Sequence, residues 1–589
     1  MKYTVLPQYH PAAALRMPYL WASLLDDWAH LPEKVDANFK VTSTLDFYHG
    51  RNLPKLFALD TENDAAGKIG SWSLAYRDES GQLCAEPFMY ANKDFVVPDD
   101  CRVIMHHAKH DLNVMRANKM PLPKNVVDTF ISAYCMGHGK QDPKDSGKSG
   151  DRMVGGLGLK YLARRHLGMQ MKSWMQVRDD ASAMVQYNCE DSIGTYLLWE
   201  KWQKDLPKHF WTIDMPLLNV LMKMEDRGIL ADSKFLQEYA KTLDTRLGEI
   251  DLKGINPYSP DQVAKYIYED LGYKPTKFTE TGNPSTDKEV LETIDDPIVK
   301  AILEYREVYK ERKTYVGAYA ERMDSEGRIH CEFKQTSTAT GRLSSANPNL
   351  QNVMKGTLRT LFIPKEGHSL VVLDYKQLEL RTFATLTREH KMLDALHADR
   401  SIHQETADVL GISYDDAKVV NFLMLYGGTA WKISQEFYVP IDEAHAMIYK
   451  YYSAYPGIKA YHENQREIAR TQKSVTAWSG RTRRLDGMYS EDRKTIRDAE
   501  NLAINLPIQC TGAEIVKLAM IDLDTKHNAP MLLQVHDELL FEVPENEAED
   551  YAHWLTEYIP KITEINGELF PVDVGFGKNW LEAKENKIK

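Results

Sequence analysis

Short apolar runs alternate with amphipathic stretches in the first third of the chain. The apolar runs predict strands at Lys55–Asp60, Gly70–Tyr76 and Val103–Met105. The amphipathic stretches predict helices at Asp128–Met136, Gly158–His166 and Asp180–Lys204. This alternation indicates a mixed α/β domain. The stretch His138–Gly155 is rich in Gly, Lys and Asp without any period, which predicts a mobile surface loop.

From Asp214 onward the pattern is mostly helical, and a long amphipathic helix is expected at Pro297–Arg322. After Pro364 apolar runs predict further strands, at Ser369–Asp374, Met531–His536 and Leu539–Val543. A helical block at about 402–473 separates the first of these strands from the other two. We therefore expect a sheet domain that carries an inserted helical subdomain.

The chain has 589 residues, which at ~150 residues per domain predicts roughly four compact units. Hydrophobic residues make up 43% and charged residues 27%, which is globular usage and excludes a disordered or fibrous chain. No apolar run approaches the ~18 residues of a membrane helix, and the N-terminus lacks the apolar core of a secretory signal. Six scattered cysteines without a CxxC pair indicate buried thiols in a reducing compartment. We expect an intracellular protein with no membrane partner.

The formal net charge is −12, from 73 basic and 85 acidic residues. This balance argues mildly against a polyanionic partner, because nucleic-acid affinity depends largely on Lys and Arg. Net charge is an average over the surface, however, and a protein that holds metals on carboxylates can still bind DNA in a basic groove. Local charge has to decide.

Residues 1–51 are rich in aromatic residues and Pro, and they predict an arm of unknown role. The piece Leu6–Arg16 resembles the closing motif of some uracil-DNA glycosylase-like modules. Because the arm is too short to hold that fold, we expect it to pack against the rest of the chain and to lack that activity.

The first candidate site begins at Asp60 and Glu62, where an apolar strand ends in two acids. Strand side chains alternate between faces, so both carboxylates point to the same side. They repel each other unless a cation lies between them, and oxygen ligands suit Mg²⁺ or Mn²⁺. Two acids spaced in this way, without any further motif, are more often simply solvated at a strand end. Asp111 is expected at another strand end, and Tyr187 and Asp191 lie four apart on one helix face.

These three motifs resemble those of the DEDD-type 3′–5′ exonucleases in their Tyr variant. The resemblance implies two metal ions on Asp60, Glu62, Asp111 and Asp191. It also implies that one ion activates water, that the other stabilises the leaving 3′ oxygen, and that Tyr187 positions the water. Family members usually carry Asn and an aromatic residue at the second motif, where this chain has His107 and His110. That departure bears on the strand-end geometry and on the level of activity.

The second candidate site joins two remote acids. An apolar strand ends at Asp374, and the later stretch Leu532–Phe541 predicts a tight hairpin with Asp537 and Glu538 at its turn. Sheet pairing would bring the acids together as a second site for a hard cation. Taken singly, each would be an ordinary strand end.

Lys418, Phe422 and Tyr426 lie four apart and form one helical stripe. A cation, an aromatic face and a phenol in this order could hold phosphate, base and sugar. For an isolated helix, an amphipathic core helix with an extended Lys is the commoner explanation.

Together the three pieces resemble motifs A, B and C of family A DNA polymerases, which are similar to DNA polymerase I. Further motifs follow in the family's order, at Thr340–Ser345, Asn347–Asn352, Ile402–His403, Ala503–Gln509 and Phe576–Trp580. The resemblance covers roughly residues 52–589. It implies a template-directed DNA polymerase with 3′–5′ proofreading, acting in DNA replication on primer-template DNA and dNTPs.

The resemblance also implies the fold, an α/β and α+β multidomain chain. An RNase H-like exonuclease domain at 52–205 would precede a right-hand polymerase domain at 206–589. Within the latter, the thumb is expected at about 206–345, the fingers at about 401–499, and the palm at about 346–400 and 500–589. A compact polymerase with a proofreading domain resembles bacteriophage replicative enzymes. We accordingly expect a monomer in the cytoplasm of a bacterial host, with any replisome partner unknown.

By resemblance, Asp374, Asp537 and the backbone carbonyl of Tyr375 hold two Mg²⁺ ions, with Mn²⁺ as a substitute, and Glu538 is an accessory acid. Lys418 and His403 contact the triphosphate, and Lys418 donates a proton to pyrophosphate. The other nucleotide-binding residues implied are Gln377, Glu379, Phe422 and Tyr426. Of these, Tyr426 stacks near the templating position, Glu379 excludes a ribose 2′-hydroxyl, and Phe422 discriminates against dideoxynucleotides.

DNA contacts are implied for residues that read the minor groove of the primer-template end: Arg342, Gln351, Asn505, Gln509 and His536. Backbone contacts are expected from the long helix, at Arg306, Lys310, Arg312 and Lys313, and from the basic hairpin Arg481–Arg484. Three positions depart from the family pattern, because Tyr414 and Asn501 stand where Arg is usual and Cys510 stands where Gly is usual. With Tyr414 in place of Arg, either another cation covers the triphosphate or the affinity for it is weaker. Asn501 and Cys510 bear on fidelity and on binding of the primer terminus.

Three other functions compete with this interpretation. One is a DNA exonuclease whose polymerase half acts only as a DNA clamp. Another is a non-catalytic factor that binds primer-template DNA. The last is single-subunit RNA synthesis, which Glu379 and the attached exonuclease disfavour.

Overall fold

The computed structural model describes residues 38–42, 52–64, 66–138, 156–177, 181–279 and 281–588. Most of the predicted arm at 1–51, including the Leu6–Arg16 piece, lies outside these residues. So does residue range 139–155 of the predicted surface loop. None of the helices in the described ranges is long and apolar enough to cross a bilayer.

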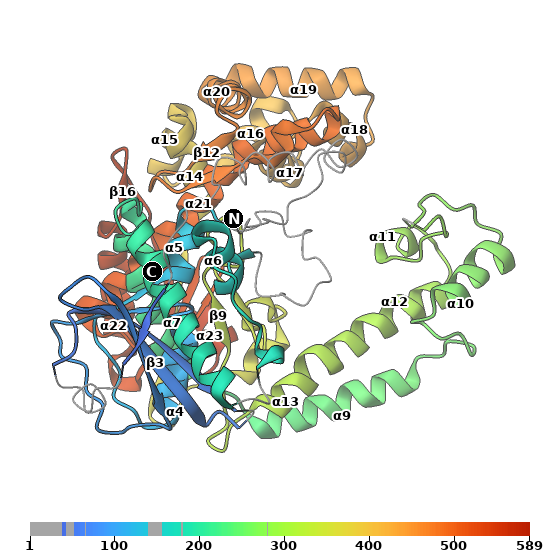
Figure 1. The fold of residues 1–589 in the computed structure, drawn as a ribbon. Helices are drawn as coiled ribbons and strands as arrows, with labels where there is room; N and C mark the ends of the chain where they lie inside the picture. The colour runs from blue at the N-terminus through green and yellow to red at the C-terminus, as the bar shows by residue number, and fades with distance from the viewer. Residues whose placement is uncertain are drawn as a thin grey trace.

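A six-stranded mixed sheet forms the first unit (Figure 1). Its strands, in spatial order, are β1 (Lys40–Val41), β4 (Leu83–Met89), β3 (Ile69–Arg77), β2 (Leu56–Asn63), β5 (Arg102–Met105) and β6 (Val126–Asp128). Strands β2, β5 and β6 run parallel, whereas β3 is antiparallel to both of its neighbours. Its helices are α4 (Ala108–Ala117), α5 (Thr129–Cys135), α6 (Leu159–Leu167) and α7 (Ala181–Trp202). Helix α7 packs across β2, β3 and β4.

The three strands and three helices predicted in this unit are confirmed, but β1, β4, β6 and α4 were not predicted. Strand β4 escapes the apolar pattern because Glu86 and Pro87 interrupt it. Glu86 is nevertheless fully buried, where the hydroxyl of Tyr76 donates to it at 3.0 Å. Because its carboxylate is hydrogen-bonded, Glu86 can be buried in a strand that lacks hydrophobic alternation.

Long helices follow the first unit and project away from it as a pair. Helix α8 (Met215–Arg227) leads through strand β7 (Ile229–Leu230) to α9 (Ser233–Glu249), and β7 pairs with the later strand β8 (Arg328–Ile329). Helix α12 (Pro297–Lys310), the π-helical turn η6 (Glu311–Gly317) and α13 (Ala318–Arg322) form the predicted long helix at Pro297–Arg322. Figure 1 shows α9 and α12 side by side, with α10 (Pro260–Ala264) and α11 (Lys288–Leu291) at their far end. That end has its own small core around Val263, Leu291 and Ile302.

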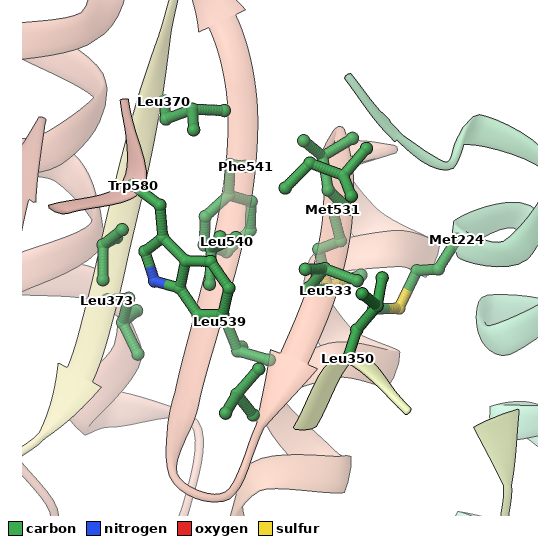
Figure 2. Packing of buried hydrophobic residues seen from close by; sticks show 14 of the residues in the cluster. Met224, Leu350, Leu370, Leu373, Met531, Leu533, Leu539, Leu540, Phe541 and Trp580 are labelled. Atoms are coloured by element: carbon green, nitrogen blue, oxygen red, sulfur yellow. The ribbon is translucent and has the colours of Figure 1, made fainter. Parts of the chain in front are cut away.

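A four-stranded antiparallel sheet forms the centre of the second half. Its order is β14 (Met531–Val535), β15 (Glu538–Pro544), β11 (His368–Tyr375) and β18 (Val572–Gly577). The helices around it are α14 (Leu378–Thr387), α21 (Arg493–His527), α22 (Ala548–Tyr558) and α23 (Trp580–Glu585). Figure 2 shows part of its core, to which β15 contributes Leu539 and Leu540, α23 contributes Trp580 and α8 contributes Met224.

The predicted strands β11, β14 and β15 are confirmed, whereas β18 was not predicted as a strand. Its glycines weaken the strand pattern, and the packing explains them. A Cβ on Gly575 would lie 2.4 Å from the carbonyl oxygen of Ala583, and one on Gly577 would lie 2.7 Å from the nitrogen of the same residue. Helix α23 therefore lies against β18 more closely than a side chain would allow.

The inserted helical block is confirmed at the top of Figure 1. Its helices are α15 (His390–His397), α16 (Ile402–Leu410), α17 (Tyr414–Leu425), α18 (Ala430–Phe437), α19 (Ile441–Ala454) and α20 (Pro456–Gln472). The hairpin β12 (Ser474–Thr476) and β13 (Thr482–Arg484) then leads into α21, which returns to the central sheet. The remaining short pairs are β9 (Glu332–Lys334) with β10 (Ser344–Ala346) and β16 (Glu564–Ile565) with β17 (Glu568–Leu569).

All six cysteines are buried and unpaired, so the prediction of buried thiols is confirmed.

Candidate active sites

Three carboxylates converge on the first sheet. Asp60 and Glu62 on β2 and Asp191 on α7 bring ligand oxygens within 4.8 Å of one another. The strand does not end at the two acids as predicted, because β2 continues to Asn63. Asp60 and Glu62 still share a face, with the buried Thr61 between them.

The expectation for Asp111 was wrong in its placement. Asp111 lies in the first turn of α4 and not at a strand end. His107 adopts φ 68°, a left-handed conformation, and turns the chain from β5 directly into this helix. The carboxylate of Asp111 accepts hydrogen bonds from the Thr61 amide at 3.1 Å and the Thr61 hydroxyl at 2.7 Å. It fixes β2 beside the three-acid cluster and is not one of the three.

Tyr187 and Lys160 complete this centre. Tyr187 shares a helix face with Asp191, as its spacing predicted. Lys160 on α6 places its Nζ 3.4 Å from Oδ2 of Asp191 and 3.6 Å from the Tyr187 ring centroid. Sequence analysis did not identify Lys160, because a single lysine in an amphipathic helix looks like a solvated side chain.

Burial and mutual repulsion disfavour the charged forms of these acids. Burial raises the pKa of Asp60 well above its ordinary value, and Asp111 and Asp191 raise it further. Burial and the charge of Asp191 raise the pKa of Glu62 to about 7. Burial raises the pKa of Asp191 to about 6 although Lys160 opposes the shift. A set of oxygen ligands that resists its own charge fits Mg²⁺ or Mn²⁺.

His107 and His110, at the start of α4, form a stacked pair. Their ring centroids are 6.3 Å apart with an interplanar angle of 9°. The His107 amide donates to Oδ1 of Asp128 at 3.0 Å, which fixes the left-handed turn. Burial lowers the pKa of His107 to about 4, with a contribution from His110. The pair is therefore largely neutral near pH 7.

The second centre lies where β11 meets the β14–β15 hairpin. Asp374 is directly opposite Glu538, and the amide of Tyr375 donates to the backbone oxygen of Asp537 at 3.2 Å. His536 takes φ 57° at the tight turn. The sheet thus brings Asp374 and Asp537 to one edge from 163 positions apart in the sequence. Burial raises the pKa of Asp537 to about 6, and the charge of Asp374 adds to this. Carboxylates of this kind fit Mg²⁺.

Glu538 differs from both aspartates because protein groups already occupy its carboxylate. It is buried, and the guanidinium of Arg359 lies 3.4 Å from Oε1. The indole N–H of Trp580 and the ammonium of Lys584 also contact it. Its partners leave it as a structural acid next to the hairpin turn, and sequence analysis did not connect any of the three with it.

A cavity of about 620 Å³ lies next to this edge. The sequence-predicted residues that line it are Arg342, Gln377, Glu379, His403, Lys418, Phe422, Tyr426, Gln509, His536 and Asp537. Lys418, Phe422 and Tyr426 share one stripe of α17 and its C-cap, as predicted. His403 meets Tyr414 edge to face, with ring centroids 5.7 Å apart. Tyr426 donates its hydroxyl hydrogen to Oε2 of Glu379 at 3.0 Å.

Two of the residues expected to contact DNA lie elsewhere. Gln351 is buried, and its side-chain amide donates to Oε1 of Gln534 at 2.8 Å. Asn505 does not line the cavity, and its buried Oδ1 has no partner among the described residues. Gln351 therefore supports the hairpin and does not face the cavity.

Most of the arginines expected to bind the DNA backbone are bonded to groups inside the protein. Arg481 is fully buried and pairs with Asp214 at 2.8 Å and Glu514 at 2.9 Å. Arg483 is also buried and donates to the carbonyl oxygens of Tyr134 and Ala339 at 3.1 Å. The basic hairpin was misjudged because sequence alone does not show its buried acceptors.

On the long helix, Arg306 donates to the carbonyl oxygens of Pro257 and Thr286 at 2.7 Å. Arg312 pairs with Asp244 at 2.8 Å. Only Lys310 and Lys313 of this predicted set are strongly exposed.

Comparisons with known proteins show the family of this chain. The family model described as DNA polymerase family A matches residues 230–582. DNA polymerase I of Pseudomonas aeruginosa is 33% identical over 553 residues, which cover 86% of this chain and 60% of that protein. The thermostable DNA polymerase I of Thermus thermophilus is 36% identical over 401 residues, which cover 63% and 48%. The chain thus spans between about half and three fifths of the length of these curated relatives.

A solved structure shares the fold. The POL domain of Pol1 from M. smegmatis, in complex with DNA primer-template and dNTP, has a TM-score of 0.79 and 23% identity, and the match covers 92% of this chain and 100% of that one. The fold is therefore that of the POL domain. The chain belongs to the family A DNA polymerases.

Proposed function

We propose that the protein is a template-directed DNA polymerase that adds deoxynucleotides to a primer 3′ end, with a 3′–5′ exonuclease for proofreading. The polymerase assignment rests on one observation: Asp374 and Asp537 meet at one edge of the central sheet, beside the 620 Å³ cavity that Lys418 lines. Membership of family A supports it, as does the primer-template and dNTP named for the M. smegmatis structure.

Asp374, Asp537 and the backbone carbonyl of Tyr375 would hold two Mg²⁺ ions. When bound, these ions would acidify the primer 3′-hydroxyl and stabilise charge on the transferring phosphate. Lys418 would hold the triphosphate by charge and donate a proton to the departing pyrophosphate. His403, whose pKa burial and Lys418 both lower, would donate as a neutral imidazole. Gln377 would complete the polar wall.

Sugar and base selection would depend on Glu379, which Tyr426 and Arg342 hold from two sides. A fixed carboxylate beside C2′ leaves no room for a ribose hydroxyl. Tyr426 would stack near the templating position. Gln509 and His536, which also line the cavity, would read minor-groove acceptors that occur in similar places in every correct pair.

The exonuclease would use the three-acid cluster on the first sheet. Asp60, Glu62 and Asp191 would hold the metal ions, Asp111 would support them, and Tyr187 would position water. We assign it to an RNase H-like domain at 52–205 and the polymerase to 206–589, with thumb, palm and fingers bounded as in the sequence analysis.

Two substitutions separate the activities on one labelled primer-template. Asp374→Ala should lower synthesis by roughly a thousandfold or more and spare degradation in the absence of dNTPs. Asp60→Ala should do the reverse. Synthesis at the wild-type rate by the Asp374→Ala protein would show that the polymerase assignment is wrong. Degradation without any synthesis by the unmodified protein would favour the alternative, an exonuclease whose second half is a DNA clamp.

An intracellular location, a monomeric state and a bacteriophage source stay predictions.

A further inference from the structure

The carboxylates at the polymerase edge differ in the cations that contact them. Asp573 lies opposite Asp374 in the sheet and is paired with both Lys376 at 3.1 Å and Lys587 at 2.6 Å. Glu538 is contacted by Arg359 and Lys584. Within the described ranges, Lys584 is the single cation paired with Asp374, at 3.1 Å from Oδ2, and Asp537 forms no ion pair. Lys584 therefore bridges one candidate metal ligand and one structural acid.

The position of Lys584 is built into the fold. It lies on α23, which the Trp580 side chain anchors in the core and which Gly575 and Gly577 admit against β18. Its ammonium lies between β11 and β15, the two strands that carry Asp374 and Glu538. The side chain is 30% exposed, whereas that of Glu538 is 3% exposed. Only the Asp374 side of this contact is open to exchange with solvent.

The two contacts should respond differently to a divalent cation. Glu538 is buried and its carboxylate is also held by Arg359 and Trp580. A metal ion from solvent therefore does not compete with Lys584 for Glu538. Asp374 is 28% exposed and has oxygens that suit a hard cation. Two cations cannot share one carboxylate edge without repulsion.

We propose that Lys584 is a positioning residue that holds the Asp374 carboxylate in the metal-free enzyme and competes with a metal ion for it. Lys584 thereby sets the metal affinity of the polymerase edge while it stays paired with Glu538. The inference rests on the proposed polymerase function. It assigns to the C-terminal helix a role in metal binding.

The test measures Mn²⁺ binding to the free, full-length protein by electron paramagnetic resonance. All variants carry Asp60→Ala, which removes the exonuclease centre as a second metal site. The polymerase site is the class of bound Mn²⁺ that Asp374→Ala eliminates. Lys584→Met should bind Mn²⁺ at this site roughly three- to tenfold more tightly, because Asp374 loses its competing cation. Lys584→Gln should shift in the same direction, and Lys584→Arg, which keeps the charge, should stay within about twofold.

Lys578→Met is the matched control. Lys578 precedes α23, is exposed and pairs with Glu545, away from Asp374. It should leave Mn²⁺ affinity unchanged. Equal or weaker binding by both Lys584→Met and Lys584→Gln would overturn the inference, because a purely structural role predicts loss of a well-ordered site. If no Mn²⁺ class disappears with Asp374→Ala, the proposed function fails instead.

Discussion

Glu379 illustrates how single side chains are fixed in the cavity. Its Oε2 accepts from Tyr426 at 3.0 Å, and its Oε1 pairs with Arg342. Burial and the charge of Glu379 raise the pKa of Tyr426 to about 12, so the phenol remains a donor at any physiological pH. The carboxylate is held from both sides and forms a rigid wall. Phe422 lines the same cavity and has no polar group to offer a sugar.

Phe422→Tyr should raise the incorporation of dideoxynucleotides relative to deoxynucleotides by roughly ten- to hundredfold. The added hydroxyl can replace the hydrogen bond that a sugar without a 3′-hydroxyl fails to supply. The measurement is the ratio of kcat/KM values for the two nucleotides in single-nucleotide primer extension. Phe437→Tyr, on α18 and outside the cavity lining, is the control and should leave the ratio unchanged. An unchanged ratio for Phe422→Tyr would count against the assignment of this helix.

At this scale, sequence could predict residues whose spacing carries the signal. Lys418, Phe422 and Tyr426 follow the helical period, and Asp60 and Glu62 follow the strand period. It could not predict Lys160, Lys584 or Arg359, because each meets its carboxylate only through tertiary contacts and has no local pattern. The contact between Gln351 and Gln534 could not be predicted for the same reason, since the two residues are remote in sequence.

At the scale of elements, the hairpin β12–β13 joins parts of the chain that are far apart in sequence. Arg481 at its turn bonds Asp214 before α8 and Glu514 on α21, and Arg483 bonds the carbonyl of Tyr134 on α5. Burial alone would raise the pKa of Asp214, but Arg481 holds it well below the ordinary value. This network connects helix α5 of the first unit to α21, the helix that returns to the central sheet.

Arg481→Met should lower the free energy of unfolding by about 3–5 kcal/mol, because it leaves the Asp214 carboxylate buried without its main partner. Thermal or urea unfolding followed by circular dichroism measures the change. The control is Arg484→Met, in the same hairpin, whose partly exposed pair with Asp486 should contribute less than about 1 kcal/mol. Equal stability losses for the two variants would contradict a structural role specific to Arg481.

The elements themselves were largely predictable where apolar periodicity is strong, as in β11, β15 and α12. The missed strands have identifiable causes. Strand β4 buries a paired glutamate, and β18 uses glycines because α23 lies against it. Asp111 was predicted at a strand end because the sequence pattern does not show that His107 adopts a left-handed conformation and starts helix α4.

At the scale of the whole molecule, two carboxylate centres resist their own charge. Burial raises the pKa of Glu62 and Asp111 to about 7 and those of Asp191 and Asp537 to about 6. For an acid whose pKa is higher in the folded than in the unfolded state, the stabilising contribution is complete below the unfolded value near 4. It is lost as the pH rises through about 6 to 7. The metal-free protein should therefore lose stability as the pH rises from about 4 to about 7.

Mg²⁺ should reverse that loss, because it replaces the protons that the acids give up. We expect the rise in Tm on addition of Mg²⁺ to be a few degrees larger at pH 8 than at pH 5.5. Differential scanning calorimetry with and without chelator measures it. The Asp60→Ala, Asp374→Ala double variant should show little difference between the two pH values. A Mg²⁺ effect that is equal or larger at pH 5.5 would contradict this account of the two centres.

The central claim is that Asp374 and Asp537 share metal ions at one edge, and metal-directed backbone cleavage tests it most directly. Fe²⁺ with ascorbate and peroxide is added to the Asp60→Ala protein, and the fragments are sized by mass spectrometry. Metal ions shared by the two aspartates should direct cuts to within a few residues of both Asp374 and Asp537. Excess Mg²⁺ should suppress these cuts, and Asp374→Ala should abolish them together. Cuts near only one of the two aspartates, or a pattern that Asp374→Ala leaves intact, would contradict this claim.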